Sequence, residues 1–245
     1  MVRYGLIGKS LSHSFSQRWF SDKFTREGLG DHRYDLFELD RVEDLQGLME
    51  GTPGLVGLNV TIPYKQSVMP LLHAVDPSAL AVGAVNTIRI QHGLATGYNT
   101  DVEGFRATLL PLLHGATPRA LVLGSGGASR AVVFVLRELG LKFRVVSRSR
   151  ERGDLTWDLL DPAIVNVCTL IINTTPLGMY PEVEGMPKIP MQAIGPKHVL
   201  IDLIYNPEQT RFLKQGEQRG AVVSNGMTML QAQAEASWRI WRFPA

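Results

Sequence analysis

Short apolar runs alternate with amphipathic segments over the first hundred residues. The strand-like runs are residues 3–8, 33–39 and 55–63, and the helix-like segments are residues 16–28, 42–49 and 64–73. Regular alternation of this kind predicts βα units and a largely parallel sheet.

A second series of the same kind begins near residue 119. Its strand-like runs are residues 119–124, 142–147, 169–175 and 198–205, and its first helix-like segment is 128–140. Between the two series, residues 101–113 have apolar side chains at helical spacing and predict a linker helix that kinks or ends near Pro111. The sequence therefore predicts an α/β protein with two domains, an N-terminal α/β domain and a Rossmann-like domain with a parallel sheet.

The last twenty residues predict an amphipathic helix over residues 226–245. Leu230, Ala234, Trp238 and Trp241 fall on one stripe, as the core-facing side of a surface helix requires. We expect this helix to pack on the first domain. The predicted domains are then residues 1–100 completed by 226–245, and residues 101–225 beginning with the linker helix 101–113.

Composition excludes several classes of protein. Of the 245 residues, 44% are hydrophobic and 20% are charged, as in globular proteins and unlike disordered or fibrous ones. The apolar runs fall far short of the roughly 20 residues of a membrane-spanning helix. The 25 basic and 23 acidic residues leave a net charge of +2, too nearly balanced for the basic surface of a nucleic-acid-binding protein.

The sequence predicts a cytoplasmic protein, on two grounds, and it predicts no metal site. No secretory signal is visible at the N-terminus, and the single cysteine, Cys168, cannot form an internal disulfide, which suits a reducing compartment. The apolar neighbours of Cys168 predict a buried side chain. No group of His, Cys and carboxylate residues has the spacing of metal ligands.

A glycine-rich turn, GSGGAS at residues 124–129, lies between a predicted strand and a predicted helix. Glycines in this setting let the backbone approach a pyrophosphate, whose charge the helix N-terminus stabilises. A plain strand-to-helix turn is the alternative. We interpret the turn as nucleotide-binding, through Gly124, Ser125, Gly126, Gly127 and Ala128.

The next strand indicates which nucleotide is bound. About 20 residues beyond the turn, an NAD-binding protein usually carries Asp or Glu for the ribose 2′-hydroxyl. This chain has Ser147, Arg148 and Ser149 there, followed by Arg152, and arginine binds a 2′-phosphate through charge-assisted hydrogen bonds. The sequence therefore predicts NADP rather than NAD, with a solvated basic loop as the alternative.

Polar residues also occur where a strand of the first domain should be apolar. Asn59 and Thr61 alternate with Leu58 and Val60, so they share one face of the strand. Lys65 follows near the start of a predicted helix, where the helix dipole disfavours a cation. An exposed first-turn lysine is the alternative, but a residue placed against its local preference is a candidate for function.

Five further residues are open to a structural or a functional interpretation. Ser14 and Ser16 lie just after the first strand, where either can cap the next helix or contact a ligand. Asp101 begins the linker helix, and the helix dipole stabilises it in either role. Asn86 is an amide in a strand-like run, and Gln233 lies at the edge of the C-terminal apolar stripe.

Eight sequence blocks together resemble the shikimate dehydrogenase family. They are HSFS at 13–16, NVTIPYK at 59–65, AVNT at 84–87, NTD at 99–101, GSGGASR at 124–130, NTTPLGM at 173–179, DLIYNP at 202–207 and MLQAQAEAS at 229–237. The resemblance implies NADPH-dependent, reversible reduction of the 3-keto group of 3-dehydroshikimate to shikimate, in aromatic amino-acid (chorismate) biosynthesis. It also implies that residues 1–100, with 226–245, bind the substrate and that residues 101–225 bind NADP.

The resemblance further implies roles for individual residues. Lys65 and Asp101 would be the catalytic acid–base pair. The substrate would be held by Ser14, Ser16, Asn59, Thr61, Asn86, Tyr205 and Gln233. The cofactor would be held by Gly124 to Ala128, Ser147, Arg148, Ser149 and Arg152, with Thr174, Leu203 and Gly226 near its nicotinamide.

The chain departs from the family pattern at three places. Gln17 stands where proline usually follows the second serine, residues 147–149 replace a common Asn-Arg-Thr, and residues 150–168 are shortened. Two alternatives stay open: a quinate/shikimate dehydrogenase that uses NAD, and a non-catalytic ligand sensor of similar fold. The expected partner is a small molecule, with no nucleic acid and no membrane. The sequence leaves the oligomeric state open, a homodimer included.

Overall fold

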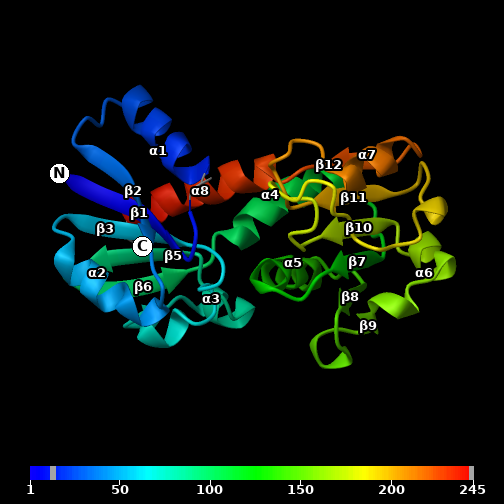
Figure 1. Ribbon diagram of the computed structural model, residues 1–245, viewed down its shortest axis with the longest axis horizontal. Coiled ribbons are helices and arrows are strands. Elements are labelled where there is room, and N and C mark those ends of the chain that lie inside the picture. The colour runs from blue at the N-terminus through cyan, green and yellow to red at the C-terminus, as the bar shows by residue number, and fades with distance from the viewer. Residues whose placement is uncertain (12–14, 243–245) are drawn as a thin grey trace. The chain divides into compact units, whose positions relative to one another are not determined.

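A computed structural model describes residues 1–11 and 15–242, and the chain divides into two compact units. The first unit comprises Met1–Thr100 and Ala234–Ala245, and the second comprises Asp101–Gln233. Figure 1 shows the helices and strands of both units and labels those for which there is room.

The first unit contains a six-stranded sheet with the strand order β2-β1-β3-β5-β6-β4. The strands are β1 (Val2–Gly8), β2 (His32–Glu38), β3 (Leu55–Val60), β4 (Ala74–Val75), β5 (Thr87–Gln91) and β6 (Leu94–Tyr98). The helical elements are α1 (Phe15–Arg26), η1 (Val42–Asp44), α2 (Leu45–Gly51), η2 (Met69–Leu71), α3 (Pro77–Val82) and the C-terminal part of α8 (Met227–Arg242).

This sheet is mixed, but five of its six strands run in one direction, as the predicted largely parallel sheet requires, and β5 alone is reversed. β1 runs parallel to β2 and β3, whereas β5 runs antiparallel to both β3 and β6. The two-residue turn His92-Gly93 joins β5 to β6, and both residues have positive φ angles of 52° and 78°. Such a turn matches the twist of a β-hairpin, so these strands are connected directly and need no crossover helix.

The α-helix predicted over residues 64–73 does not form. The segment makes turns that end in the short 3₁₀ helix η2. Lys65 O accepts a hydrogen bond from Val85 N at 2.7 Å, and Met69 N donates to Gln66 O at 3.2 Å. Pairing with a distant segment has therefore replaced the local helix, and the argument that placed Lys65 at a helix N-terminus does not hold.

The two faces of the first sheet bury different side chains. Helices α1 and α8 cover one face (Figure 1). This face buries an aromatic cluster of Tyr4, Phe20, Phe24, Tyr34, Trp238 and Trp241. The other face, covered by α2 and α3, buries aliphatic residues that include Ile7, Leu45, Leu58 and Ile88. Alternation along β1 explains the division, since Leu6 joins the aromatic cluster and the next residue, Ile7, joins the aliphatic one.

The predicted apolar stripe of the C-terminal helix is confirmed, because Leu230, Ala234, Trp238 and Trp241 are all buried. From Ala234 onward the helix belongs to the first unit. Trp241 Nε1 donates to Ile88 O at 2.9 Å, and a Cβ atom at Gly57 would overlap the indole ring of Trp241. The absence of a side chain at Gly57 thus lets the tryptophan reach the sheet.

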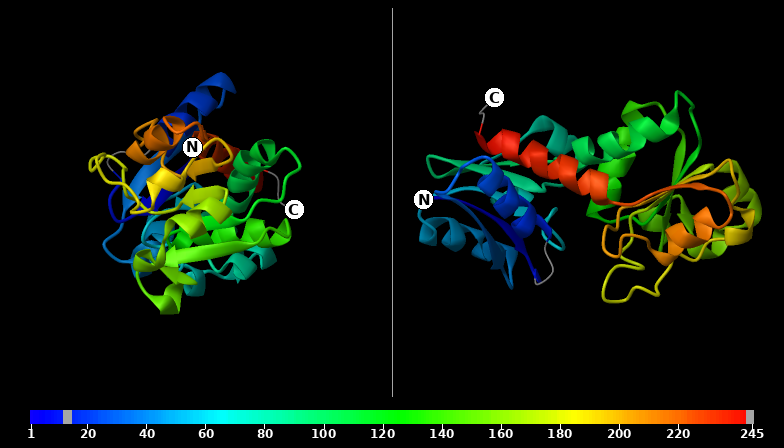
Figure 2. Two further views of the ribbon diagram at one scale, coloured as in Figure 1. Left: turned by 90° about the vertical axis from the view of Figure 1, so that its right-hand side faces the viewer. Right: turned by 90° about the horizontal axis from the view of Figure 1, so that it is seen from above.

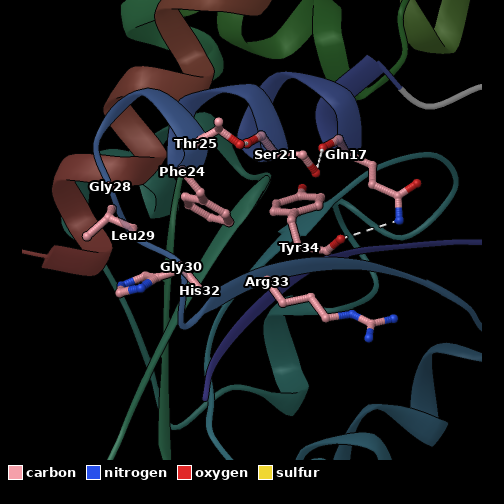
Figure 3. Close-up of a pocket in the computed structure, with 10 residues that line it drawn as sticks. All are labelled: Gln17, Ser21, Phe24, Thr25, Gly28, Leu29, Gly30, His32, Arg33 and Tyr34. Carbon is pink, nitrogen blue, oxygen red and sulfur yellow. Dashed lines mark hydrogen bonds between the residues drawn. The ribbon is translucent and has the colours of Figure 1, made fainter.

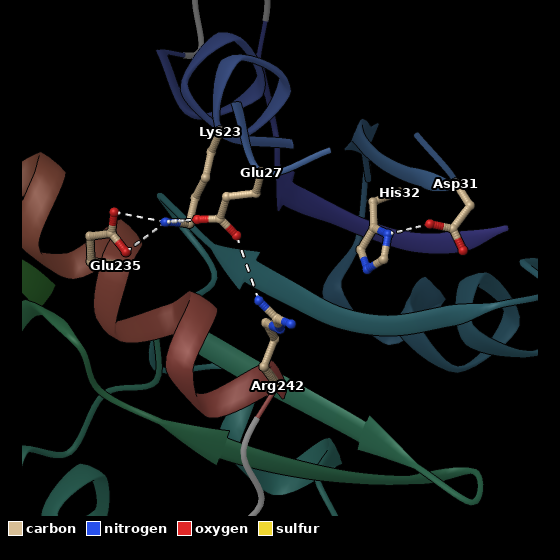
Figure 4. Close-up of polar contacts among 6 residues, drawn as sticks. All are labelled: Lys23, Glu27, Asp31, His32, Glu235 and Arg242. Atoms are coloured by element: carbon tan, nitrogen blue, oxygen red, sulfur yellow. Dashed lines mark hydrogen bonds and ion pairs between the residues drawn. The ribbon is translucent and has the colours of Figure 1, made fainter. Parts of the chain in front are cut away.

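An ion-pair cluster joins α1 to α8 within the first unit (Figure 4). Lys23 is only 6% exposed, and its ammonium lies 2.8 Å from Glu27 Oε1 and 2.9 Å from Glu235 Oε1. Arg242 pairs with Glu27 at 3.6 Å, and the Lys23 ammonium also lies over the ring of Trp238. The two helices lie side by side in Figure 1 and in the right-hand view of Figure 2. The buried cation is thus neutralised by carboxylates of α8 and of the turn that follows α1.

The second unit contains a six-stranded parallel sheet with the order β12-β11-β10-β7-β8-β9. The strands are β7 (Ala120–Leu123), β8 (Phe143–Ser147), β9 (Leu155–Thr156), β10 (Leu170–Asn173), β11 (Val199–Asp202) and β12 (Val222–Ser224). The helical elements are α4 (Asp101–Leu113), α5 (Gly127–Glu138), η3 (Arg150–Arg152), η4 (Trp157–Leu159), α6 (Pro162–Val167), η5 (Met191–Ala193), α7 (Arg211–Glu217) and the first part of α8. This strand order is that of the Rossmann fold, which confirms the predicted fold class.

Two properties expected from composition can be compared with the structure. Cys168 is buried in the apolar core of the second unit, as predicted. In the described part of the chain, none of the helices combines the length and the hydropathy of a membrane-spanning segment.

Candidate functional site

The carboxyl edge of the second sheet brings together four residues predicted to bind the cofactor. Gly124 follows β7, Thr174 follows β10, Leu203 follows β11, and Gly226 lies just beyond β12. A Cβ atom at Gly124 would lie 2.6 Å from Thr174 Oγ1, and one at Gly226 would overlap Leu203 O. The loops that carry these residues are therefore in close contact, at the edge where open α/β sheets bind ligands.

The glycine turn has the backbone geometry of a phosphate-binding loop. Gly124 has a φ of 111°, a conformation that strains other residues. Gly126, the N-cap of α5, has a φ of −84°, and a Cβ atom there would meet no atom of residues 1–11 or 15–242 within 4 Å. Neither backbone strain nor packing within this part of the chain requires glycine at 126, and the position leaves room for a ligand to approach the backbone. Because an N-cap glycine leaves the first N–H groups of α5 to an anion, the residues present fit a nucleotide pyrophosphate.

The loop after β8 carries the arginines predicted to bind a 2′-phosphate. Ser147 is buried at the end of β8, where its hydroxyl bonds Ser149 O and accepts from Ser149 N at 3.1 Å. Arg152 Nη2 donates to Ser125 O of the glycine turn at 3.5 Å. Arg148 is exposed and forms no hydrogen bond or ion pair with residues 1–11 or 15–242. The structure thus brings the loop to the glycine turn and leaves one guanidinium available for an anion.

In the first unit, a buried hydrogen-bond network joins two residues predicted to bind the substrate. Asn59 Nδ2 donates to Asn86 O at 3.3 Å, to Thr87 Oγ1 at 3.2 Å and to Ser237 Oγ at 2.9 Å. Asn86 Oδ1 accepts from Thr100 N at 2.7 Å. The structure therefore brings Asn59 and Asn86 together, and Thr100 directly precedes Asp101 in the chain.

Tyr34 of β2 extends this network toward α1. Its hydroxyl donates to Asn59 Oδ1 at 2.8 Å, and Ser16 lies half-buried in the first turn of α1. Burial raises the pKa of Tyr34, so the hydroxyl stays protonated at neutral pH. Ser14, the other predicted serine, lies outside the described residues.

The remaining predicted substrate and catalytic residues are distributed between the two units. Thr61 and Lys65 are half-buried in the segment after β3 of the first unit. In the second unit, Asp101 is 2% exposed at the start of α4, and Tyr205 and Gln233 are half-buried after β11 and in α8. All five residues therefore keep polar side chains in partly or fully buried positions.

A surface pocket of about 610 Å³ lies between α1 and β2 in the first unit (Figure 3). Its polar lining groups already have partners within the protein. Ser21 Oγ donates to Gln17 O at 2.8 Å, Thr25 Oγ1 donates to Ser21 O at 3.0 Å, and Arg33 pairs with Asp35. Because these groups already have hydrogen-bond or ion-pair partners within the protein, they do not need a ligand as a partner. We therefore do not include the pocket in the candidate site.

The sequence analysis missed a buried carboxylate that supports the nucleotide edge. Asp202 Oδ1 accepts from Asn173 Nδ2 at 3.0 Å and from Ile204 N at 3.1 Å, and its Oδ2 accepts from Thr210 Oγ1 at 2.7 Å. Burial raises the pKa of Asp202 to about 6. These bonds hold the segments that follow β10 and β11. The sequence could have indicated them, because a polar residue, Asn173 or Asp202, stands at the end of each apolar run.

The sequence analysis also missed Ser237 and Tyr34, although the position of Ser237 in the sequence indicates a buried hydroxyl. It is fully buried on the helix α8 that carries the apolar stripe, and a hydroxyl in such surroundings needs a partner. Within residues 1–11 and 15–242, no group of three or more His, Cys, Asp or Glu side chains could hold a metal ion.

Comparison with known sequences finds the same family over nearly the whole chain. Residues 6–88 match the shikimate dehydrogenase substrate binding domain. The shikimate dehydrogenase (NADP(+)) of Desulforamulus reducens is 35% identical in an alignment of length 260. This alignment covers 97% of this chain and 88% of that protein. The shikimate dehydrogenase (NADP(+)) of Methanococcus maripaludis is 37% identical in an alignment of length 255. This alignment covers 97% of this chain and 90% of that protein.

Solved structures agree with the sequence comparison. Shikimate 5-dehydrogenase from Thermus thermophilus in complex with NADP(H) and shikimate has a TM-score of 0.86 and 30% identity, covering 99% of this chain and 94% of that one. Quinate dehydrogenase from Corynebacterium glutamicum in complex with NAD has a TM-score of 0.88 and 28% identity, covering 98% and 93%. By sequence and by fold, the chain belongs to the shikimate dehydrogenase family.

Proposed function

We propose that this chain catalyses the NADPH-dependent, reversible reduction of 3-dehydroshikimate to shikimate in aromatic amino-acid (chorismate) biosynthesis. The observation that supports it best is the nucleotide edge of the second unit. There Gly126 is open to a ligand, and the neighbouring loop offers the exposed Arg148, which forms no ion pair with residues 1–11 or 15–242. Relatives named as NADP-dependent shikimate dehydrogenases align with 97% of the chain.

The second unit would hold the cofactor, which supplies the hydride. Backbone N–H groups of residues 124–128 at the start of α5 would bind the pyrophosphate. Arg148 and Arg152 would bind the 2′-phosphate, in a loop that Ser147 and Ser149 shape by their mutual hydrogen bonds. Thr174, Leu203 and Gly226 would line the nicotinamide end.

Lys65 and Asp101 would act on the reacting carbonyl. A carbonyl that accepts hydride develops negative charge on its oxygen, and the Lys65 ammonium both stabilises that charge and gives the proton. In the reverse direction Lys65 takes the proton back. Asp101 would orient the ammonium and accept a hydrogen bond from a substrate hydroxyl.

The substrate's carboxylate and hydroxyl groups need several polar partners. These would be Ser14, Ser16, Asn59, Thr61, Asn86, Tyr205 and Gln233. They include hydroxyl and amide side chains, which can donate to a carboxylate and accept from hydroxyl groups.

Initial rates of nicotinamide reduction test the function directly. The purified protein is given shikimate or quinate, each with NADP or NAD, and kcat/KM is compared for the four combinations. Efficient turnover of shikimate with NADP supports the proposal. A preference for NAD or quinate would keep the reaction class and overturn the assignment of cofactor or substrate. Binding of shikimate without turnover would favour the ligand-sensor alternative.

Substitution of Lys65 tests the mechanism. Lys65→Ala should lower kcat by roughly 10²- to 10⁴-fold while the fold survives, because the variant keeps the main-chain oxygen that accepts from Val85 N. Lys65→Arg is the matched variant, since it keeps a positive charge but gives up a proton far less readily. Turnover close to wild type in Lys65→Ala would remove Lys65 from the mechanism.

The proposal also covers location and assembly. One buried cysteine and a biosynthetic reaction suit the cytoplasm, and fractionation of cells tests that location. Light scattering of the purified protein distinguishes a homodimer from a monomer.

A further inference from the structure

We propose that Asp154 is a positioning residue for the cofactor, which holds the loop of Arg148 against β8 and thereby favours NADP over NAD. The inference rests on the proposed function, because it takes Arg148 as a contact of the 2′-phosphate. Asp154 lies at the end of this loop, residues 148–154, and is not among the residues that the family resemblance assigns to the site.

The loop is a short connection between two parallel strands. β8 ends at Ser147, and β9 begins at Leu155 and pairs in parallel with the last two residues of β8 (Figure 1). Parallel neighbours are usually joined by a crossover of about a dozen residues or more. Residues 148–154 make the connection with only the 3₁₀ helix η3, so the loop needs bonds of its own to keep its course.

Burial of side chains does little to fix the loop. Each of residues 148–154 is exposed or half-buried. A surface cavity of about 430 Å³ is bounded by residues 150–154 together with α5 and β8, so side chains do not fill the space beside the loop. Because the loop has no buried anchor, its hydrogen bonds decide which of its conformations it keeps.

Asp154 closes the loop through contacts with β8. Its main-chain N–H donates to Val145 O at 2.8 Å, and its Oδ2 accepts from Val145 N at 2.8 Å. One residue thus bonds both main-chain polar groups of Val145, just before the point where β9 begins to pair with β8. Asp154 Oδ1 also lies 3.7 Å from Arg144 Nη1, an exposed ion pair that contributes little. The side-chain bond to Val145 is therefore the contact that a substitution can remove selectively.

Gly153 shows how closely the loop approaches β8. Its backbone is extended, with a φ of −166°, so its conformation does not require glycine. A Cβ atom there would lie 2.8 Å from Val145 O and 3.0 Å from Ser147 Cβ, which is closer than a side chain tolerates. The absence of a side chain at this position thus lets Asp154 reach Val145.

Hydrogen bonds also hold the other end of the loop. Ser147 Oγ donates to Ser149 O and accepts from Ser149 N at 3.1 Å. Arg152 N donates to the same Ser149 O at 3.2 Å. Arg148 therefore belongs to a loop that is fixed at both ends. Without the Asp154 carboxylate one end would be released, and NADP binding would have to order it.

The charge and the position of Asp154 have opposite effects on NADP binding. The carboxylate is negative and lies in the loop proposed to bind the 2′-phosphate, so its removal would strengthen NADP binding through charge alone. Through position, its removal would weaken NADP binding. NAD has no 2′-phosphate, and its binding should change little in either case. The direction of the change therefore identifies the role.

The test compares Asp154→Ala with Asp154→Asn. In Asp154→Ala we expect KM for NADP to rise about fivefold, as for the loss of one hydrogen bond, with kcat and KM for NAD within about twofold of wild type. Asp154→Asn removes only the charge, because its amide oxygen still accepts from Val145 N, so KM for NADP should stay at or below the wild-type value. No rise in Asp154→Ala, or an equal rise in both variants, would overturn the inference.

Asp161→Ala is the matched control. Asp161 is an exposed aspartate of the same unit, and its Oδ1 also accepts one main-chain bond, from Ile164 N at 2.8 Å. The control should lower the melting temperature about as much as Asp154→Ala and leave KM for NADP unchanged. An equal rise in KM for NADP in both variants would show a general effect of stability and overturn the inference.

A double-mutant cycle tests whether Asp154 acts through Arg148. In the Arg148→Ala background, Asp154→Ala should change KM for NADP by less than about twofold. Effects that multiply independently would contradict the inference. Should Asp154→Ala fail to fold, Gly153→Ala forces the loop away from β8 while keeping the carboxylate. We expect it to raise KM for NADP about threefold, and an unchanged KM would overturn the inference.

The experiment also distinguishes this inference from the proposed function. A wild-type protein that prefers NADP, with an unchanged KM for NADP in Asp154→Ala, overturns the inference alone. If the wild type binds NADP without oxidising shikimate, the dissociation constants for NADP give the same test by calorimetry. A wild type that binds NAD as tightly as NADP overturns the cofactor assignment and the inference with it.

Discussion

Replacing Asp202 by asparagine tests whether a buried carboxylate lowers the stability of the second unit at neutral pH. Asp202 is fully buried and accepts hydrogen bonds from Asn173, Ile204 and Thr210. In Asp202→Asn, the amide oxygen can keep the bonds from Asn173 and Ile204, and the amide nitrogen can donate to Thr210 Oγ1. The substitution therefore removes the charge and keeps the shape and the contacts.

The magnitude follows from the pKa of the Asp202 carboxyl group. Burial raises this pKa from 3.8 to about 6, although three hydrogen-bond donors oppose the shift by favouring the charged form. Between these values the folded protein binds more protons than the unfolded chain, so the free energy of unfolding falls as the pH rises through this window. A shift of about two units corresponds to about 3 kcal/mol, which Asp202→Asn should recover at neutral pH.

Urea denaturation of both proteins, at intervals between about pH 4 and pH 8, measures this effect. Other titrating groups are common to the two proteins and largely cancel in the difference between their free energies of unfolding. Relative to wild type, the variant should gain about 3 kcal/mol from about pH 4 to pH 7. A difference that does not depend on pH, or that falls as pH rises, would refute the reasoning and show that the three hydrogen bonds outweigh burial.

Three further substitutions test the nucleotide edge and the packing of α8. Arg148→Ala should raise KM for NADP by roughly 10- to 100-fold and leave KM for NAD unchanged, since it removes a charge-assisted bond to the 2′-phosphate; Arg150→Ala, also exposed in this loop, should alter neither constant. Gly126→Ala should change the free energy of unfolding by less than about 1 kcal/mol but raise KM for NADP at least tenfold, and an unchanged KM would mean that the cofactor does not approach this turn. Gly57→Ala should destabilise the protein by about 1–3 kcal/mol in thermal unfolding, because its Cβ atom would overlap the indole ring of Trp241; wild-type stability would show that the tryptophan moves at little cost.

Elements whose signal is local could be predicted from the sequence. Residues 128–140 show a continuous helical pattern, and α5 occupies Gly127–Glu138. The glycine turn was recognisable because its strand, turn and helix are consecutive in the chain. Residues 64–73 also show a helical pattern, but the bond between Val85 N and Lys65 O replaces it with turns, and a pattern along the chain does not reveal a partner that distant.

The site residues show the same contrast. Arg148 is a candidate because of its distance along the chain from the glycine turn. The network around Tyr34 could not be predicted, because Asn59 and its partner Ser237 are separated by 178 residues. A hydroxyl group in a predicted strand or helix indicates only that a partner is needed. Which residue meets it depends on the sheet register that sets Asn59 beside Thr87.

The late position of α8 in the chain has a consequence for the order of folding during synthesis. The aromatic cluster of the first unit includes Trp238 and Trp241, so this unit cannot complete its core until α8 has left the ribosome. The sheet of the second unit is complete by Ser224. The unit made first should therefore fold last, against the usual N-terminal-first order. A chain truncated after Gln233 should leave the first unit sensitive to protease while the sheet of the second resists it.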